Sequence, residues 1–313
     1  MDSLTSPIRI APLCIALLAV CACGADESGP TAYFDLSGAT NTPATFFDAP
    51  FPSDLRLDAE GRMDYSGHPN PKDSAPVQDL IEGAARHKGA STMTSVTFRF
   101  DGQLAERSDI DPVAARADAP FLLVDIDPLS PERGRLFPTV AKTLPVDGYL
   151  GEFGLAVAPW PGVILPTNRT FATIVMRDAG DASGGPLGVA DEVAALAADA
   201  VPEGALGQAA AELYVPMFET LDMLGIDRSE VAAASVFTTA DVVQDLFDLS
   251  SAIVDAYDIS IDDIVLDPED GDHPTYCELV ATIEFPQFQE GTAPFNDKGL
   301  FAIGADVHGQ PVG

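Results

Sequence analysis

Apolar and polar residues alternate over short segments in the first half of the chain. Val96, Phe98 and Phe100 occupy every second position, which is the spacing of a strand with one buried face. Turn formers such as Trp-Pro-Gly separate the apolar segments, and residues 77–88 are the one place where a helical pattern of ten or more residues could occur. The spacing therefore predicts an antiparallel β-sandwich rather than a parallel α/β sheet. The predicted strands are residues 94–100, 121–126, 153–159 and 171–176.

The pattern changes to a helical period after Gly188. Residues 190–200 and 206–224 are rich in Ala, Leu, Glu and Met, and the second segment carries an apolar stripe. Pro216 lies inside it and is expected to kink or split the helix, while Gly225 is well placed to end it. Further elements are expected beyond this point: a strand at 231–237, a helix over 240–256 capped by Thr238 or Thr239, and strands at 277–285 and 300–303.

The first residues have the features of an export signal. The apolar run over residues 10–20 is too short to cross a bilayer as a helix, which needs roughly 20 residues. It follows Arg9 and ends in Ala22-Cys23-Gly24, which resembles a bacterial lipobox. We therefore expect residues 1–22 to be a signal peptide and Cys23 to be lipidated. The Gly after the cysteine favours delivery to the outer membrane or cell surface, with the lipid as the membrane partner.

The mature chain is expected to have three parts. Residues 23–45 are small and polar, which indicates a flexible tether. Residues 46–188 would form an ordered aromatic and proline-rich arm, whose Phe46, Phe47, Phe51 and Leu55 pin it to the core, followed by the sandwich. Residues 189–313 would form the helical segment with its returning strands, leading into a further C-terminal domain outside this sequence.

Two stretches, residues 96–104 and 165–187, resemble the opening and closing strands of bacterial Ig-like modules. With the lipobox, the arm at 49–55 and the segment 236–239, they occur in an order that resembles the N-terminal region of bacterial lipoprotein lipases of the virulence-factor lipase type. The resemblance implies a β-rich region that precedes an α/β-hydrolase domain. The Gly-x-Ser-x-Gly nucleophile motif is absent from the sequence, so no catalytic residue is carried over.

Charge excludes one class of partner. The chain has 16 basic and 49 acidic side chains, a formal net charge of −33. A surface this negative repels phosphate backbones, so we expect no nucleic-acid binding. Cleavage before Cys23 would leave Cys277 as the single free cysteine, which rules out a disulfide framework and suggests a small buried strand residue.

Calcium is the one cofactor that the acidic residues suggest. Three acidic turns, at residues 58–64, 178–183 and 267–272, carry the oxygen ligands that Ca²⁺ prefers. Random clustering in so acidic a chain is the alternative. The leading candidate site consists of Asp267, Glu269, Asp270 and Asp272.

The sequence thus predicts a mainly β fold, an Ig-like antiparallel β-sandwich with an appended α-helical segment. The predicted function is that of an exported surface lipoprotein that acts as a non-catalytic accessory or recognition module, with a lipid, carbohydrate or protein ligand. Two alternatives remain open: the N-terminal portion of an extracellular lipase or esterase whose α/β-hydrolase domain lies beyond residue 313, and a calcium-stabilised adhesion-type structural domain.

Overall fold

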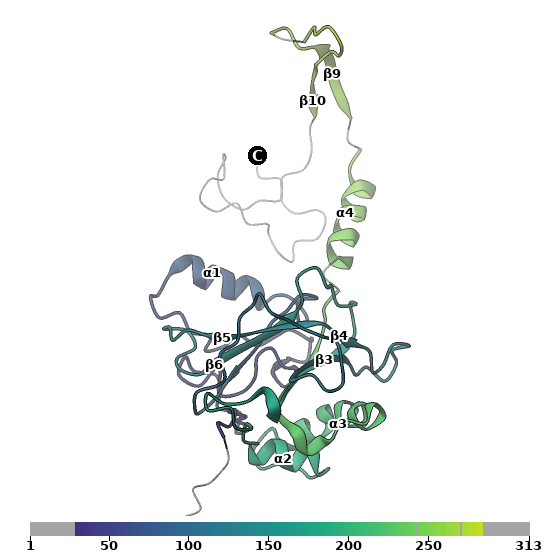
Figure 1. The fold of residues 1–313 in the computed structure, drawn as a ribbon. Coiled ribbons are helices and arrows are strands. Elements are labelled where there is room, and N and C mark those ends of the chain that lie inside the picture. Colours follow the sequence, from purple (N-terminus) through teal and green to yellow (C-terminus); the bar gives the residue numbers. More distant parts are fainter. Residues whose placement is uncertain (1–28, 242, 259, 270, 284–313) are drawn as a thin grey trace, which may run out of the picture.

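The computed structural model describes residues 29–283, apart from residues 242, 259 and 270. These residues form a layered body from which a helix and a hairpin extend (Figure 1). Two four-stranded antiparallel sheets make up the first two layers. In strand order, the first sheet contains β1 (Val96–Arg99), β6 (Gly154–Pro159), β5 (Thr139–Leu144) and β2 (Pro112–Val113). The second contains β4 (Leu136–Phe137), β3 (Phe121–Asp125), β7 (Thr170–Met176) and β8 (Val231–Thr238).

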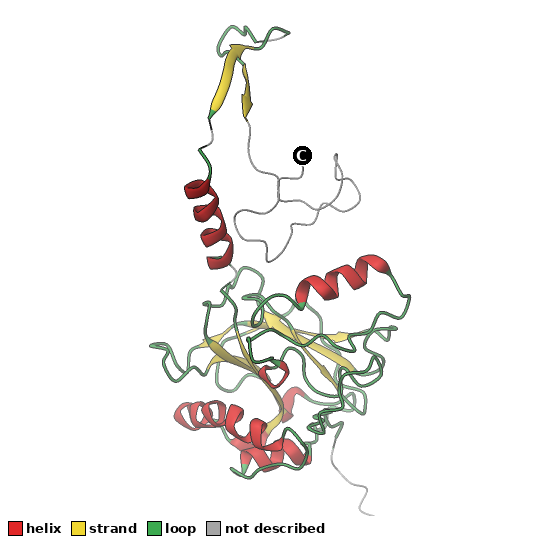
Figure 2. Ribbon diagram, turned by 180° about the vertical axis from the view of Figure 1, so that it is seen from behind, coloured by secondary structure: helices red, strands yellow, loops and turns green. Residues whose placement is uncertain are grey.

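Helices form the third layer. Figures 1 and 2 show α2 (Asp191–Ala197) and α3 (Gly207–Leu224) together on one side of the body, with α1 (Ala75–Ala84) on the opposite side. Short 3-10 helices at Asp54–Arg56, Arg177–Ala179 and Arg228–Glu230 join the main elements. The prediction of a mainly β fold with antiparallel sheets is confirmed, whereas α2 and α3 lie between β7 and β8 in the sequence rather than after the sheets.

The order of the layers explains why buried and half-exposed residues alternate in some strands and why other strands are buried throughout. Strand β1 has one buried face, so Val96 and Phe98 point into the core between the sheets while their neighbours stay half-exposed. The second sheet lies between the first sheet and the helices, so every residue of β3 is buried. Phe121 and Leu123 join the core between the sheets, whereas Leu122 and Val124 join the core under the helices. Burial on both faces produces the continuous apolar runs of the sequence.

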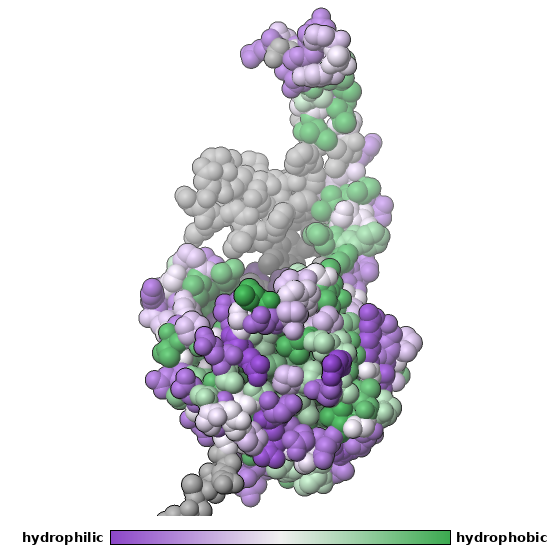
Figure 3. Space-filling view, viewed as in Figure 1, coloured by the Kyte–Doolittle hydropathy of each residue, from purple (hydrophilic) through white to green (hydrophobic). Residues whose placement is uncertain are grey.

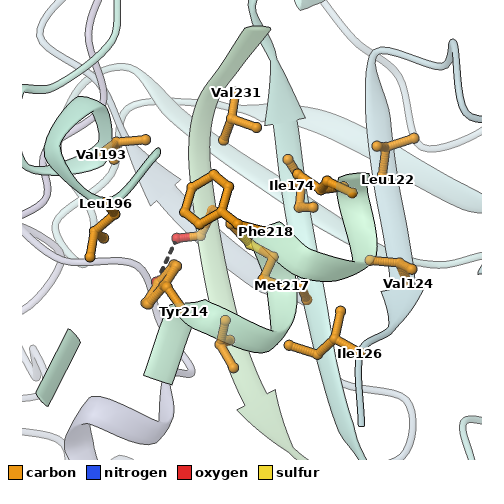
Figure 4. Packing of buried hydrophobic residues seen from close by; sticks show 14 of the residues in the cluster. Leu122, Val124, Ile126, Ile174, Val193, Leu196, Tyr214, Met217, Phe218 and Val231 are labelled. Atoms are coloured by element: carbon orange, nitrogen blue, oxygen red, sulfur yellow. Dashed lines mark hydrogen bonds between the residues drawn. The ribbon is translucent and has the colours of Figure 1, made fainter. Parts of the chain in front are cut away.

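The core under the helices is built by α2 and α3 against the second sheet (Figure 4). Tyr214 of α3 is buried and donates its hydroxyl to the Ala234 carbonyl of β8, at 3.0 Å. Its partner satisfies the one polar atom that this large side chain brings into the core. Burial raises the pKa of Tyr214, so the hydroxyl stays protonated and keeps donating.

Helix α3 ends where the sequence predicts, and the structure decides one of the two outcomes predicted for Pro216. Gly225 ends it in a left-handed conformation, with φ +69°, as predicted. Pro216 does not split it, and the helix runs unbroken through that residue. The Pro216 carbonyl accepts hydrogen bonds from Thr220 Oγ1, at 2.6 Å, and from Arg133 Nη2, at 3.0 Å. These bonds tie the turn that follows the proline to the loop after β3.

The prediction that the aromatic arm is ordered is confirmed. Phe46 is fully buried, and Phe51 exchanges two backbone hydrogen bonds with Thr97 of β1, at 3.1 and 2.7 Å. Farther along, Ser235 Oγ of β8 donates to the Pro52 carbonyl at 2.6 Å. The arm therefore contacts the edge strand of one sheet and a strand of the other.

The prediction of a flexible tether over residues 23–45 is wrong for the part that the structure describes. Ala32, Phe34 and Leu36 are buried, and Tyr33 N donates to Arg99 O at 2.9 Å. The Phe34 ring packs edge-on against Tyr214 of α3. The three buried residues alternate along the chain, which is a strand-like pattern that the surrounding small polar residues obscured. Residues 1–28, including Cys23, lie outside the described residues.

The predicted domain boundary at residue 188 is also wrong. Strand β8 pairs with β7 along its whole length, from Met176–Val231 to Thr170–Thr238. The core under the helices takes side chains from both sides of the boundary. Residues 29–240 therefore form one structural unit, because a strand distant in sequence completes its second sheet.

The remaining elements extend from this unit at the end opposite α2 and α3 (Figure 1). Helix α4 (Gln244–Ala256) has Val243 at its N-cap position, whereas the predicted cap was Thr238 or Thr239. Asp241 lies just before the helix, and its Oδ1 accepts from the Val243 and Gln244 amides. Strands β9 (Ile261–Leu266) and β10 (Leu279–Ile283) pair only with each other among the described residues. Cys277 precedes β10 and is exposed, so the prediction that it is buried is wrong. The strand predicted at 300–303 lies outside the described residues.

Candidate functional site

A cleft of about 680 Å³ opens between α1 and the loop that follows the arm. One wall is a short hairpin in which Leu57 pairs with Met63. Asp58 shapes its turn, because Oδ1 accepts from the amides of Glu60, at 2.9 Å, and Arg62, at 2.8 Å. The volume falls within the range of about 300–1,000 Å³ that is usual for small-molecule sites.

The opposite wall is α1, which begins after a pinned turn. Asn70 accepts from the Ser74 amide and donates to the Ser74 carbonyl, both at 3.0 Å. Pro76 follows in the first turn of the helix, where a missing N–H costs nothing. The helix thereby places Gln78, Ile81 and Glu82 on the cleft wall.

The base of the cleft adjoins an aromatic cluster formed by the arm. Phe46 lies at its centre, with Phe47, Phe51 and His68 at ring-centroid distances of 5.0, 4.9 and 5.0 Å. The Arg56 guanidinium covers the Phe46 ring at 4.3 Å and donates from Nη2 to the Phe46 carbonyl at 2.5 Å. Arg56 therefore contacts the aromatic cluster and also lines the cleft.

His68 presents one nitrogen to the backbone. Its Nδ1 lies 3.1 Å from the Pro69 carbonyl, which can only accept, so Nδ1 carries the proton. Burial lowers the pKa of His68, with the Pro69 bond opposing that shift. The neutral ring leaves Nε2 as an acceptor, and Nε2 makes no hydrogen bond within the described part of the chain.

Both signs of charge line the cleft. Arg56 and Arg62 carry positive charge, and Asp58, Asp64 and Glu82 carry negative charge. Burial lowers the pKa of Arg56 and the nearby Asp64 carboxylate opposes this shift. Burial also raises the pKa of Tyr65, which keeps its hydroxyl available as a donor. The cleft can thus hold a small ligand that carries both a carboxylate and an ammonium group.

The predicted calcium residues lie in the turn between β9 and β10. Asp267 Oδ1 accepts from the Glu269 amide at 2.8 Å, and Asp272 pairs with Cys277 in an isolated bridge. Asp270 lies outside the described residues. Among the residues that the structure describes, no three Asp, Glu, His or Cys side chains come together as a metal site. The calcium site stays a prediction.

A buried carboxylate belongs to the fold rather than to this cleft. Asp125 of β3 is completely buried, and its Oδ2 accepts from Ser130 Oγ, at 2.6 Å, and from Arg169 Nη1, at 3.2 Å. Arg169 also reaches Glu132 at 3.2 Å. The network fixes the end of β3 against the start of β7.

Sequence reasoning did not identify Arg56, Tyr65 and His68 as cleft residues. The available signal was the density of aromatic residues at 46–51 followed by Arg56 and by a proline-rich loop, since Arg and His pack readily on aromatic rings. Proximity of α1 to that loop could not be seen in the sequence.

No protein-family model, curated protein or solved structure matches the chain. The resemblance to lipase N-terminal regions therefore stays a prediction. In the described part of the chain, no helix is both long and apolar enough to span a membrane.

Proposed function

We propose that the protein is an exported surface lipoprotein of the outer membrane, anchored through Cys23, and that its body is a non-catalytic recognition module with an Ig-like sandwich. The cleft between α1 and the hairpin wall is the observation that carries the recognition role. Its volume and its lining, which combines apolar side chains with charges of both signs, support a small-molecule site. The two antiparallel sheets that share one core support the Ig-like assignment.

The ligand class follows from the charges of the cleft. Arg56 and Arg62 favour a carboxylate, and Asp64 and Glu82 favour an ammonium group. A polyanion would be repelled by the net charge of −33. The proposed ligand is therefore a small zwitterion with an apolar side chain, such as an amino acid or a short peptide.

Calorimetric titration of the leaderless chain with a panel of L-amino acids and dipeptides tests this role. Glu82→Gln and Asp64→Asn should each weaken binding about tenfold or more, because each removes a charge-assisted contact. Glu152→Gln is the matched control, since Glu152 is exposed and does not line the cleft. Absence of binding by the unaltered chain, or equal affinity in all three variants, would overturn the proposal.

Anchoring would hold the module close to the membrane. Gly29 is already packed, because a Cβ there would lie 2.1 Å from the Pro186 carbonyl, and Gly188 N donates to Pro30 O. Six residues from Cys23 to Gly29 reach at most about 20 Å. A labelled fatty acid should mark the wild-type chain and leave Cys23→Ser unmarked. Label that persists in Cys23→Ser but disappears in Cys21→Ser would move the site to Cys21. Absence of label from the wild-type chain would refute the anchor.

A second candidate is the N-terminal portion of an extracellular lipase or esterase. The observation in its favour is the exposed apolar surface of α4, where Leu246 and Phe247 are 68% and 62% exposed. Such a surface is usual at a contact with another domain. The gene sequence after Gly313 tests it: a Gly-x-Ser-x-Gly between a strand and a helix would support the enzyme, and a stop codon would support the module.

A further inference from the structure

Four basic side chains of the described residues form neither an ion pair nor a side-chain hydrogen bond. The other lysines and arginines of that part of the chain pair with a carboxylate or donate to a backbone carbonyl. A cation without an acidic partner is unexpected here, because the sequence has 49 acidic side chains for 16 basic ones. The four are Arg62, Lys72, Arg86 and Lys88.

Three of these four residues meet where α1 ends beside the hairpin wall of the cleft. Arg62 and Lys88 face each other in an antiparallel bridge, and Gly89 N donates to Gly61 O at 2.8 Å. Residues opposite each other in such a pair have Cβ atoms about 4.5–5.5 Å apart on one face, and like charges there destabilise the pair. The fold therefore places two cations together, and no carboxylate of the described residues pairs with either of them.

Helix α1 accounts for one of the three cations. Its C-cap is Ala85, and Arg86 follows directly, where the negative end of the helix dipole stabilises a positive charge. This effect falls off within the last turn of a helix. Lys88 lies farther along the chain and Arg62 belongs to the hairpin wall, so the bridge between these two needs another explanation.

The bridge lies at the rim of the cleft. Arg62 is part of the cleft lining, whereas Lys88 is exposed just outside it. The two carboxylates of the cleft that are nearest to Arg62 in the sequence have other partners. Asp58 accepts from two amides of its own turn, and Asp64 accepts from the Ser66 amide at 2.7 Å. The guanidinium and ammonium groups are therefore available to an anion that occupies the cleft.

We propose that Arg62 and Lys88 form an anion subsite at the rim of the cleft, and that the preferred ligand carries a second carboxylate besides its zwitterionic head. This inference rests on the proposed function, because it concerns the ligand of the same cleft. A short peptide with one apolar and one acidic side chain has this composition. Arginine can hold a carboxylate through two parallel hydrogen bonds, and the charges strengthen each of them.

A small ligand fits this subsite better than a macromolecule does. Contiguous apolar surface is typical of contacts with large partners. In Figure 3 hydrophobic residues gather on α4 and on the lower part of the β9–β10 hairpin, whereas hydrophilic and hydrophobic residues are mixed over the body near α1. The net charge of −33 also repels a polyanion, while a single carboxylate at the rim interacts mainly with the two nearest cations.

Calorimetric titration of the leaderless chain with leucyl-glutamate and leucyl-glutamine tests the subsite. The two dipeptides have nearly the same shape and differ by one negative charge. Leucyl-glutamate should bind about fivefold or more tightly, because two exposed cations each contribute an ion pair. General electrostatics predicts the reverse preference, since the chain is strongly acidic. Added salt should reduce the affinity ratio, because the rim is exposed.

The variant Lys88→Gln should reduce the affinity ratio of the two dipeptides to about two or less. Lys72→Gln is the matched control and should leave the ratio unchanged. Both lysines are exposed, lie outside the cleft lining and flank α1 in the sequence, and each variant loses the same charge. The urea midpoint should be the same in both variants, because exposed changes of this kind alter stability little.

Three outcomes would overturn the subsite. Equal affinity for the two dipeptides would overturn it and leave the recognition of zwitterions intact. Equal loss of the preference in Lys72→Gln and Lys88→Gln would overturn it as well, because the preference would then reflect overall charge. Binding of neither dipeptide would overturn the subsite together with the proposed function.

Discussion

Replacement of Phe46 by alanine is the most direct test of how the arm holds both the fold and the cleft. Phe46 is fully buried and touches three other rings and the Arg56 guanidinium. A buried Phe→Ala change usually costs about 3–5 kcal/mol in unfolding free energy. Here the ring pairs and the cation contact place the expected cost at the upper end, about 4–5 kcal/mol. That is a large share of the usual 5–15 kcal/mol stability of a domain.

Urea unfolding, followed by the fluorescence of the single tryptophan, Trp160, measures the effect. With a slope of about 3 kcal/mol/M, the midpoint should fall by more than about 1 M. Leu129→Ala is the control, because Leu129 is 93% exposed and should change the free energy by about 0.5 kcal/mol or less. Equal midpoints for both variants would show that the arm is not anchored by Phe46.

Two further predictions concern carboxylates. Burial raises the pKa of Asp54, and hydrogen bonds from Thr238 oppose this shift. Protonation of Asp54 therefore stabilises the folded chain fully below the ordinary pKa of 3.8, and this contribution is lost as pH rises through the pKa of the folded state. The unfolding free energy of wild type minus Asp54→Asn should therefore decline with pH above 3.8, and a constant difference in urea titrations from about pH 3 to about pH 7 would contradict this. Arg169→Leu should cost about 3–5 kcal/mol, because it leaves Asp125 charged and buried without its cation. Arg116→Gln is the control in the same denaturation assay, because Arg116 is exposed and its change should cost under about 1 kcal/mol. Similar losses of unfolding free energy in both variants would refute the buried pair.

Local patterns in the sequence predicted much of the fold. The alternation at 96–100, the apolar runs of β3 and β7, and Gly225 after α3 each report a physical constraint that acts within a few residues. Strand β4 has two residues, and β5 carries Lys142 and Thr143 among its six, so neither shows a clear period. Their strand conformation comes from pairing with neighbours that a local pattern does not reveal.

Long-range pairing explains the larger errors. Strand β8 joins the second sheet across an insertion that contains α2 and α3, so a boundary drawn from the change of pattern at residue 188 divides one unit. Phe34 and Leu36 lie in a short segment between stretches of small and polar residues, yet both enter the core under the helices. The cleft has the same origin, because α1 and the hairpin wall meet only in the folded chain.

Arginine placement links the acidic composition to the proposed ligand. With 16 basic side chains against 49 acidic ones, the fold uses guanidinium groups as internal cross-links, each donating to a backbone carbonyl. A lysine cannot do this as well, because it lacks the planar fork of several donors. The carbonyls bonded in this way include those of Phe46, Ala179, Leu187, Ala197 and Pro216.

The cleft also contains an exposed guanidinium group, because Arg62 lines it beside Arg56 and pairs through its backbone with Lys88. Local cations within a negative surface bind a small carboxylate while the surrounding field excludes larger anions. Such a field would favour the proposed small zwitterion over a nucleic acid or an anionic polymer. The Glu152→Gln control removes one negative charge outside the cleft, as Asp64→Asn and Glu82→Gln do inside it, and therefore separates recognition from general electrostatics.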